Sequence, residues 1–131
     1  AMHAVRPNPV VVSMHSFTPS MKGIDRPWDI TVIWDFDPRL NCALLDALRR
    51  ESDLVVGENE PYQGGYAGDT IDRHCLMRGL AHALVEIRQD LIADAASAQA
   101  WGERLAGILK PLLANPEFYQ SRYYGAHPVI G

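Results

Sequence analysis

A short apolar run that ends in charged residues constrains this chain more than any other feature. The apolar residues at 83–85 are followed by Glu86, Arg88 and Asp90, spaced two residues apart. A bounded apolar run is consistent with a buried strand, and alternate residues of a strand lie on one face, about 7 Å apart. The pattern therefore predicts a carboxylate, a guanidinium and a second carboxylate along one side of a strand, where its buried part ends.

Charges at the end of a buried strand need an explanation, because an unpaired buried charge is costly. One interpretation is a structural ion pair that joins Glu86 to Arg88, or joins either residue to another neighbour. The second interpretation is a catalytic carboxylate beside an arginine that binds an anion. Structural ion-pair networks also perturb charged groups, so the run by itself favours the structural interpretation and leaves the catalytic one open.

Length and composition exclude several classes of protein. The 131 residues suffice for one domain, 1–131, with a single core. The net charge is −4 and no basic stripe with interleaved aromatic residues is present, so we expect no nucleic-acid partner. No apolar run reaches the length of a membrane span, so no membrane partner is expected either. Cys42 and Cys75 lie in helical patterns without metal-ligand spacing, which predicts buried free thiols and a cytoplasmic location.

The order of the expected elements is that of an α/β domain. Strands are expected at 9–17, 29–36, 54–57 and around Glu86, and helices at 37–50, 71–78 and 94–115. This order predicts a mostly parallel sheet flanked by helices. The first two strands are joined only by a loop, so we expect them to be antiparallel or not adjacent.

Particular residues predict how the helices begin, pack and end. Asp37 before Pro38 suits an N-cap followed by the first helical position, and Leu44 belongs to the inward apolar stripe of that helix. Pro111 predicts a kink or a break in the last helix near 107–110. The aromatic tail, 116–131, is expected to pack back on the domain.

Polar side chains follow the first strand and occupy one predicted helix. Ser13 and His15 share a face where the valine-rich strand becomes polar. In open α/β sheets ligands bind beyond the carboxyl ends of strands, so His15 is either a ligand-binding residue or a hydrogen-bonded histidine at a strand end. Arg73 and His74 lie in the helix at 71–78, where solvated charges are the ordinary explanation.

Six short motifs follow one another in order along the chain. They are Ser-Met-His-Ser-Phe-Thr-Pro at 13–19, Gly23 with Arg-Pro-Trp at 26–28, Asp-Pro-Arg-Leu at 37–40, Gly-Glu-Asn-Glu-Pro-Tyr at 57–62, Thr-Ile-Asp-Arg-His at 70–74, and Glu-Ile-Arg-Gln-Asp-Leu-Ile at 86–92. Together they resemble the N-formylglutamate amidohydrolase family over residues 9–110. Any one motif is weak, whereas the ordered set is specific.

The resemblance implies a zinc-dependent hydrolase that acts on the amide bond of a small N-acyl amino acid. It also implies a fold similar to the zinc carboxypeptidase or phosphorylase/hydrolase-like fold. His15 matches the second metal histidine of the family, and Glu86 matches the late glutamate that activates water.

Substrate-binding roles are implied for a further set of polar residues. Arg88, with Arg73 or His74, would hold a substrate carboxylate or the oxyanion. An arginine fork suits a carboxylate because it forms two parallel hydrogen bonds. Asn59 and Ser13 are the other substrate-binding candidates.

The chain departs from the family at its amino-terminal side. Family domains are longer there, and the additional part would supply a histidine and an acidic metal ligand, whereas a catalytic zinc site needs three protein ligands. We therefore expect the carboxyl-terminal half of an enzyme, a fold truncated at its N-terminal side, and weak or absent zinc binding. The expected partner is a second copy of the chain or the missing N-terminal half. The alternative is a non-catalytic module that binds a small carboxylate or a protein.

Overall fold

A four-stranded mixed sheet forms the centre of the domain in the computed structural model, which describes residues 8–60 and 69–125. The strand order is β1 (Val11–Phe17), β6 (His82–Arg88), β4 (Ile30–Ile33) and β5 (Val56–Glu58). β1 is parallel to β6 and β4 is parallel to β5, whereas β4 and β6 are antiparallel. The predicted α/β class is confirmed. The first two predicted strands, β1 and β4, are not adjacent, because β6 lies between them.

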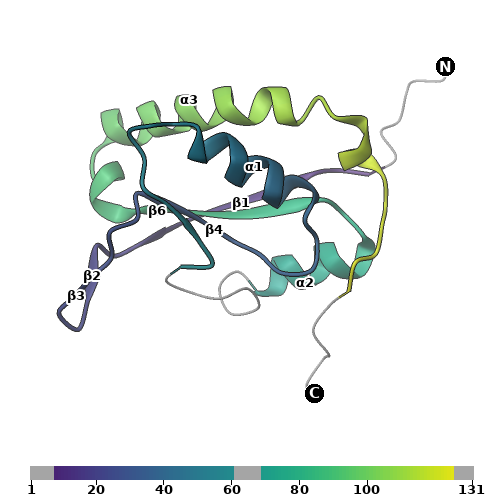
Figure 1. Cartoon of the computed structure of the whole chain (residues 1–131), viewed down its shortest axis with the longest axis horizontal. Coiled ribbons are helices and arrows are strands. Elements are labelled where there is room, and N and C mark those ends of the chain that lie inside the picture. The colour runs from purple at the N-terminus through teal and green to yellow at the C-terminus, as the bar shows by residue number, and fades with distance from the viewer. Residues whose placement is uncertain (1–7, 61–68, 126–131) are drawn as a thin grey trace.

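The helices cover the two faces of this sheet unequally. α1 (Arg39–Arg49) and α3 (Ala95–Leu112) lie together on one face, and α2 (Asp69–Arg78) lies on the other (Figure 1). The main hydrophobic core fills the space between the sheet and the α1–α3 pair. Its buried members are Ile30, Val32, Leu40, Leu44, Leu45, Leu48, Ala81, Ala83, Val85, Ile87, Leu105 and Phe118.

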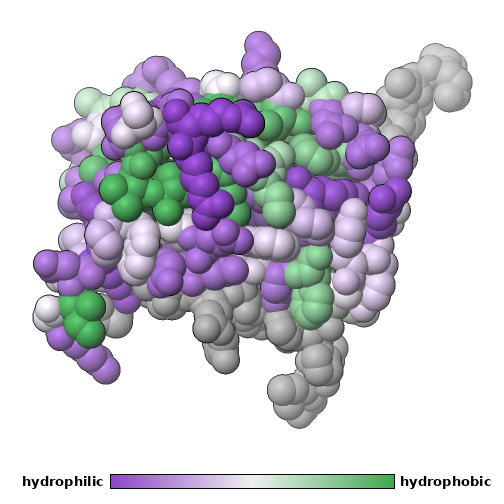
Figure 2. Space-filling view, in the orientation of Figure 1, coloured by the Kyte–Doolittle hydropathy of each residue, from purple (hydrophilic) through white to green (hydrophobic). Residues whose placement is uncertain are grey.

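A small hairpin projects from the end of the sheet where β1 and β6 finish (Figure 1). It consists of β2 (Ser20–Met21) and β3 (Ile24–Asp25), paired antiparallel. Lys22 and Gly23 join them with φ of 52° and 76°, the positive values that a tight two-residue hairpin turn requires. Ile24 is 71% exposed, and Figure 2 shows hydrophobic atoms on this hairpin, apart from the rest of the hydrophobic surface.

Two short 3₁₀ helices complete the described elements. η1 (Gln89–Ile92) follows β6 directly, and η2 (Pro116–Tyr119) follows α3. The side chain of Asp94 caps α3 by accepting a hydrogen bond from the Ser97 amide at 2.7 Å, as a carboxylate at a helix start commonly does.

Three sequence expectations need correction. Cys42 is exposed on α1, so the expected burial holds only for Cys75. α1 begins at Arg39, one residue later than expected, although Asp37 still accepts a hydrogen bond from the Arg39 amide at 3.0 Å. α3 continues through Pro111 to Leu112, so the break expected near 107–110 is absent.

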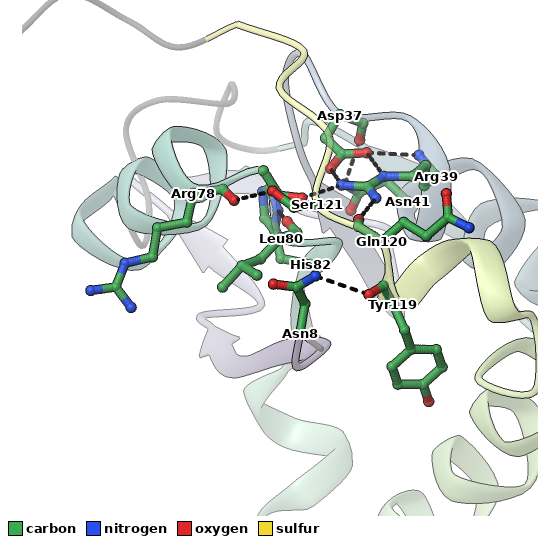
Figure 3. A network of polar contacts seen from close by, with 11 residues as sticks. Asn8, Asp37, Arg39, Asn41, Arg78, Leu80, His82, Tyr119, Gln120 and Ser121 are labelled. Atoms are coloured by element: carbon green, nitrogen blue, oxygen red, sulfur yellow. Dashed lines mark hydrogen bonds and ion pairs between the residues drawn. The ribbon is translucent and has the colours of Figure 1, made fainter. Parts of the chain in front are cut away.

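A buried ion pair attaches the C-terminal segment to the domain (Figure 3). Arg39 and Asp37 lie 2.7 Å apart, with side chains only 8% and 2% exposed. The same guanidinium donates to the backbone oxygens of Gln120 at 2.6 Å and Gly79 at 2.8 Å. Phe118 enters the core. The described part of the aromatic tail therefore packs back on the domain; residues 126–131 lie outside the described residues.

The core position of Leu44 gives a direct test of how α1 packs. Leu44 is fully buried, and Leu44→Ala should lower the free energy of unfolding by about 2–5 kcal/mol because it leaves a cavity. Asp46→Ala, at an exposed position of the same helix, should change it by less than about 0.5 kcal/mol. Urea denaturation of both variants measures the difference. Equal midpoints would mean that α1 presents another face to the sheet.

Candidate active site

One row of residues crosses the sheet from edge to edge. His15 of β1 is the register partner of Glu86 in β6, Glu86 is the partner of Thr31 in β4, and Thr31 is the partner of Gly57 in β5. Residues that are paired across neighbouring strands point to the same side of a sheet. The row therefore lies on a single face.

The row lies on the face that α1 and α3 leave free. Val85 and Ile87 belong to the core beneath those two helices, and successive side chains of a strand point to opposite faces. Glu86, between them, therefore points to the other side of the sheet, where α2 lies (Figure 1).

Glu86 is a buried carboxylate without full hydrogen bonding. It is 4% exposed, and its Oε2 atom accepts no hydrogen bond from the part of the chain that the structure describes. Burial raises the pKa of Glu86 above its ordinary value, and the electrostatic influence of His15 and Arg26 opposes this only in part. A carboxylate with a raised pKa and an open acceptor is suited to take a proton from water near neutral pH.

His15 lies beside Glu86 but is itself exposed. Its Nε2 atom forms a 3.1 Å hydrogen bond with the hydroxyl of Ser13, two residues earlier on the same face. The parallel pairing of β1 and β6 thus brings together His15 and Glu86 near the carboxyl ends of both strands. This hydrogen bond engages one ring nitrogen of His15 and leaves the other available, so both alternatives for His15 stay open.

Arg88 forms its ion pairs away from Glu86. Its guanidinium makes two hydrogen bonds to Asp90, at 2.6 and 3.2 Å, and lies 3.6 Å from Asp29. Its Nη1 atom also reaches the backbone oxygens of Pro27 at 3.5 Å and Trp28 at 3.4 Å. The structural ion pair that the sequence suggested therefore joins Arg88 to two aspartates, and Glu86 is not its partner.

Trp28 packs over the far end of the row. A Cβ atom on Gly57 would lie 2.9 Å from Cδ1 of Trp28 and 3.0 Å from Oγ1 of Thr31. Only glycine leaves room for the indole at this distance from the sheet. Trp28 thus forms a wall of the site beside Thr31.

The remaining candidates lie at the ends of β4 and β5 or on α2. Asn59 has a positive φ of 56°, and its Oδ1 accepts a hydrogen bond from the Trp34 amide at 2.7 Å, so its side chain bridges the ends of β4 and β5. Arg73 is half-buried and His74 is exposed, both on α2. Sequence reasoning gave no role to Arg26, although this residue stands in the Arg-Pro-Trp motif that carries part of the resemblance.

The described residues do not by themselves fit a zinc site. Across residues 8–60 and 69–125, no group of three or more His, Cys, Asp and Glu side chains could hold a metal ion. His15 is the nitrogen donor at the row, and a catalytic zinc site uses three protein ligands. We therefore assign no catalytic step to a metal. Within the same ranges, no helix is long and apolar enough to span a bilayer.

The fold and the row define an α/β domain that buries a carboxylate beside a histidine near the ends of two parallel strands. The family model of N-formylglutamate amidohydrolase matches residues 1–93, and the chain belongs to this family. The chain is similar to the crystal structure of gene product Atu2144 from Agrobacterium tumefaciens, with a TM-score of 0.75 and 36% identity. The match covers 84% of this chain but 44% of that one, so this chain spans less than half of its relative. No curated protein matches it.

Glu86→Gln should stabilise the chain at neutral pH. The folded pKa of Glu86 lies above the unfolded value, so its contribution to stability is full below the unfolded pKa and is lost as the pH rises through the folded pKa. The variant cannot ionise and should therefore unfold at a higher denaturant midpoint than the wild type at pH 7, with the difference narrowing toward about pH 4.

The matched control is Glu103→Gln, an exposed glutamate on α3. It should leave the midpoint unchanged at both pH values. A Glu86→Gln midpoint below that of the wild type at pH 7 would show that the ionised carboxylate is well solvated or paired.

Gly57→Ala should lower the free energy of unfolding by about 1–3 kcal/mol, because the added methyl group overlaps Trp28 and Thr31. Gly102→Ala, within α3 and with nothing within 4 Å, should instead gain up to about 1 kcal/mol from helix propensity. Thermal unfolding of both variants compares them. A neutral Gly57→Ala would mean that Trp28 does not rest on the sheet.

Proposed function

We propose that this chain supplies the proton-transfer part of an amidohydrolase site that cleaves the amide bond of a small N-acyl amino acid, with N-formylglutamate as the first substrate to test. The single observation that carries the proposal is the buried Glu86 carboxylate, which has an open acceptor atom, a raised pKa and a histidine beside it. Membership of the N-formylglutamate amidohydrolase family supports the choice of amide bond and substrate.

The chemistry assigned to Glu86 is general-base and then general-acid catalysis. Its carboxylate takes one proton from a water molecule, whose oxygen forms the new bond to the amide carbonyl carbon. The same proton passes to the amide nitrogen as the C–N bond breaks, which releases the acyl group as a carboxylic acid and the amino acid as a free amine. A positioned carboxylate of this kind contributes about 10²–10⁴-fold to the rate.

His15 is proposed as the contribution of this chain to a zinc site that further residues complete. The support is its position beside Glu86 and its imidazole, a common metal ligand. We propose that the completing residues come from a second copy of the chain or from a companion segment that contacts it. β1 supports this, because within the described ranges it has a strand neighbour on only one side.

The competing function is a binding module that holds a small carboxylate without cleaving it. The absence of a three-ligand group among the described residues favours it. Turnover distinguishes the two functions, because both bind the same class of molecule.

The test measures zinc content and hydrolysis of N-formyl-L-glutamate, on this chain and on a longer protein that adds an amino-terminal segment from the same family. This chain alone should hold less than one zinc per chain and show no measurable hydrolysis, because one histidine cannot hold the metal tightly. The longer protein should hold one zinc and turn over substrate.

Variants of the longer protein separate the two roles. Glu86→Gln should keep the zinc and lose turnover by about 10²–10⁴-fold, His15→Ala should lose both, and Glu103→Gln should lose neither. Full turnover by Glu86→Gln would remove Glu86 as the base. Carboxylate binding without hydrolysis in both proteins would favour the binding module.

A further inference from the structure

We propose that Arg88 is a positioning residue of this site. It holds the backbone that carries Trp28, and it affects substrate binding through that indole rather than by touching the substrate itself. This role rests on the proposed function, because it requires a substrate at Glu86. It differs from the direct binding of a substrate carboxylate that the resemblance implies for Arg88.

Arg88 already has carboxylate partners for its charge. Its Nε and Nη2 atoms donate to Asp90 at 2.6 and 3.2 Å, and its Nη1 atom lies 3.6 Å from Oδ1 of Asp29. A substrate carboxylate at this guanidinium would lie beside two like charges, which disfavour a further negative charge. Direct binding of a substrate carboxylate by Arg88 is therefore unfavourable.

The other contacts of Arg88 converge on three successive residues. Its Nη1 atom donates to the backbone oxygens of Pro27 at 3.5 Å and Trp28 at 3.4 Å. Its backbone amide donates to the Asp29 oxygen at 2.9 Å. Arg88 thus holds the segment 27–29 with its side chain and its main chain together.

Asp29 attaches the same segment to a second neighbour. Its amide donates to the Val55 oxygen at 2.8 Å, and its Oδ2 atom accepts a hydrogen bond from the Val55 amide at 2.7 Å. Oδ1 of this carboxylate faces Arg88. One side chain therefore links β6 to the residue before β5, and the backbone that follows Trp28 is held from both sides.

The held backbone places the indole of Trp28 on the row. A Cβ atom on Gly57 would lie 2.9 Å from Cδ1 of the indole and 3.0 Å from Oγ1 of Thr31. Thr31 is the register partner of Glu86, so Gly57 lies two strand spacings, about 10 Å, from Glu86. The indole bounds the site on its β5 side, and a shift of the 27–29 backbone would move this boundary.

The first measurement follows the indoles of this chain by fluorine NMR after fluorotryptophan labelling. The chain has three tryptophans, and Trp28→Phe identifies the resonance of Trp28. Arg88→Met should shift and broaden this resonance, because the substitution removes the side-chain contacts to 27–29. Arg88→Lys, which keeps the charge but not the planar fork, should have a smaller effect.

Arg104→Met is the matched control. Arg104 is also held by two carboxylates, Glu51 at 3.2 Å and Asp53 at 2.5 Å, and it lies over the Trp101 ring at 5.5 Å. Its loss should move the resonance of Trp101 and leave that of Trp28 unchanged.

Asp29→Asn is the second variant, in case Arg88→Met does not fold. It removes the negative charge that faces Arg88 and keeps an oxygen that can accept the hydrogen bond of the Val55 amide. Because it loosens the same segment, it should also shift and broaden the Trp28 resonance.

The second measurement is the KM of the longer protein for N-formyl-L-glutamate. Arg88→Met and Trp28→Leu should each raise KM about tenfold, with kcat nearly unchanged, as expected for the loss of binding alone. The double variant should raise KM no more than the more affected single variant, because residues that act through one contact are not additive. Arg104→Met should leave both constants unchanged.

Three results would overturn the inference. One is a Trp28 resonance that neither Arg88→Met nor Asp29→Asn moves. Another is an unchanged KM in Arg88→Met although the Trp28 resonance moves. The third is an Arg88→Met that raises KM as much in the Trp28→Leu background as in the wild type, which would mean that Arg88 touches the substrate.

Failure of the proposed function gives a different result. A longer protein that does not hydrolyse N-formyl-L-glutamate would remove the proposed catalysis. Fluorine NMR would still decide whether Arg88 positions Trp28, and the double-variant comparison would be made on binding of the same compound. Hydrolysis that depends on Glu86, together with a Trp28 resonance that is insensitive to Arg88, would remove only the inference.

Discussion

The pairing of β6 along both of its edges is the constraint on which the site depends. β1 and β4 hold this strand in a register that directs Val85 and Ile87 into the core and Glu86 to the opposite face. A slip of one residue would reverse every side chain of the strand. It would place a carboxylate beneath α1 and α3 and remove two apolar residues from the core there, so the hydrophobic core and the position of Glu86 select the same register.

The burial of Glu86 lowers the stability of the fold while it suits the carboxylate to the proposed proton transfer. The strand around Glu86 is buried, yet its Oε2 atom has no hydrogen-bond donor among the described residues. An ionised carboxylate in such a place destabilises the fold, and a sequence under selection for stability alone would replace it. Arg88 shows the opposite case nearby, because Asp90 and Asp29 satisfy its charge. Glu86 and Arg88 lie on the same face of one strand, but only Arg88 has ion-pair partners that balance its charge.

Local patterns in the sequence predicted the features that depend on residues close together in the chain. The apolar stripe of α1 placed Leu44 in the core, and the polar ends of two strands singled out His15 and Glu86. Such patterns could not predict contacts between segments that are distant in the chain. Nothing in the sequence around Asp29 indicates that it pairs with Arg88, 59 residues later, and nothing near Arg26 indicates that its charge reaches Glu86. The edge position of β1 follows from the strand order, and hydrophobic periodicity cannot predict that order.

The contact between Arg39 and the end of the chain has a practical consequence for shortening the protein. Arg39 donates to the main-chain oxygen of Gln120, so this hydrogen bond can form whatever side chain stands at position 120, whereas removal of the backbone there eliminates it. The Arg122 amide adds a bond to the Gly79 oxygen at 2.8 Å. A shortened chain that keeps α3 but stops before Gln120 would remove an acceptor from a buried guanidinium. Proteolytic trimming and expression boundaries are therefore safe only beyond Arg122.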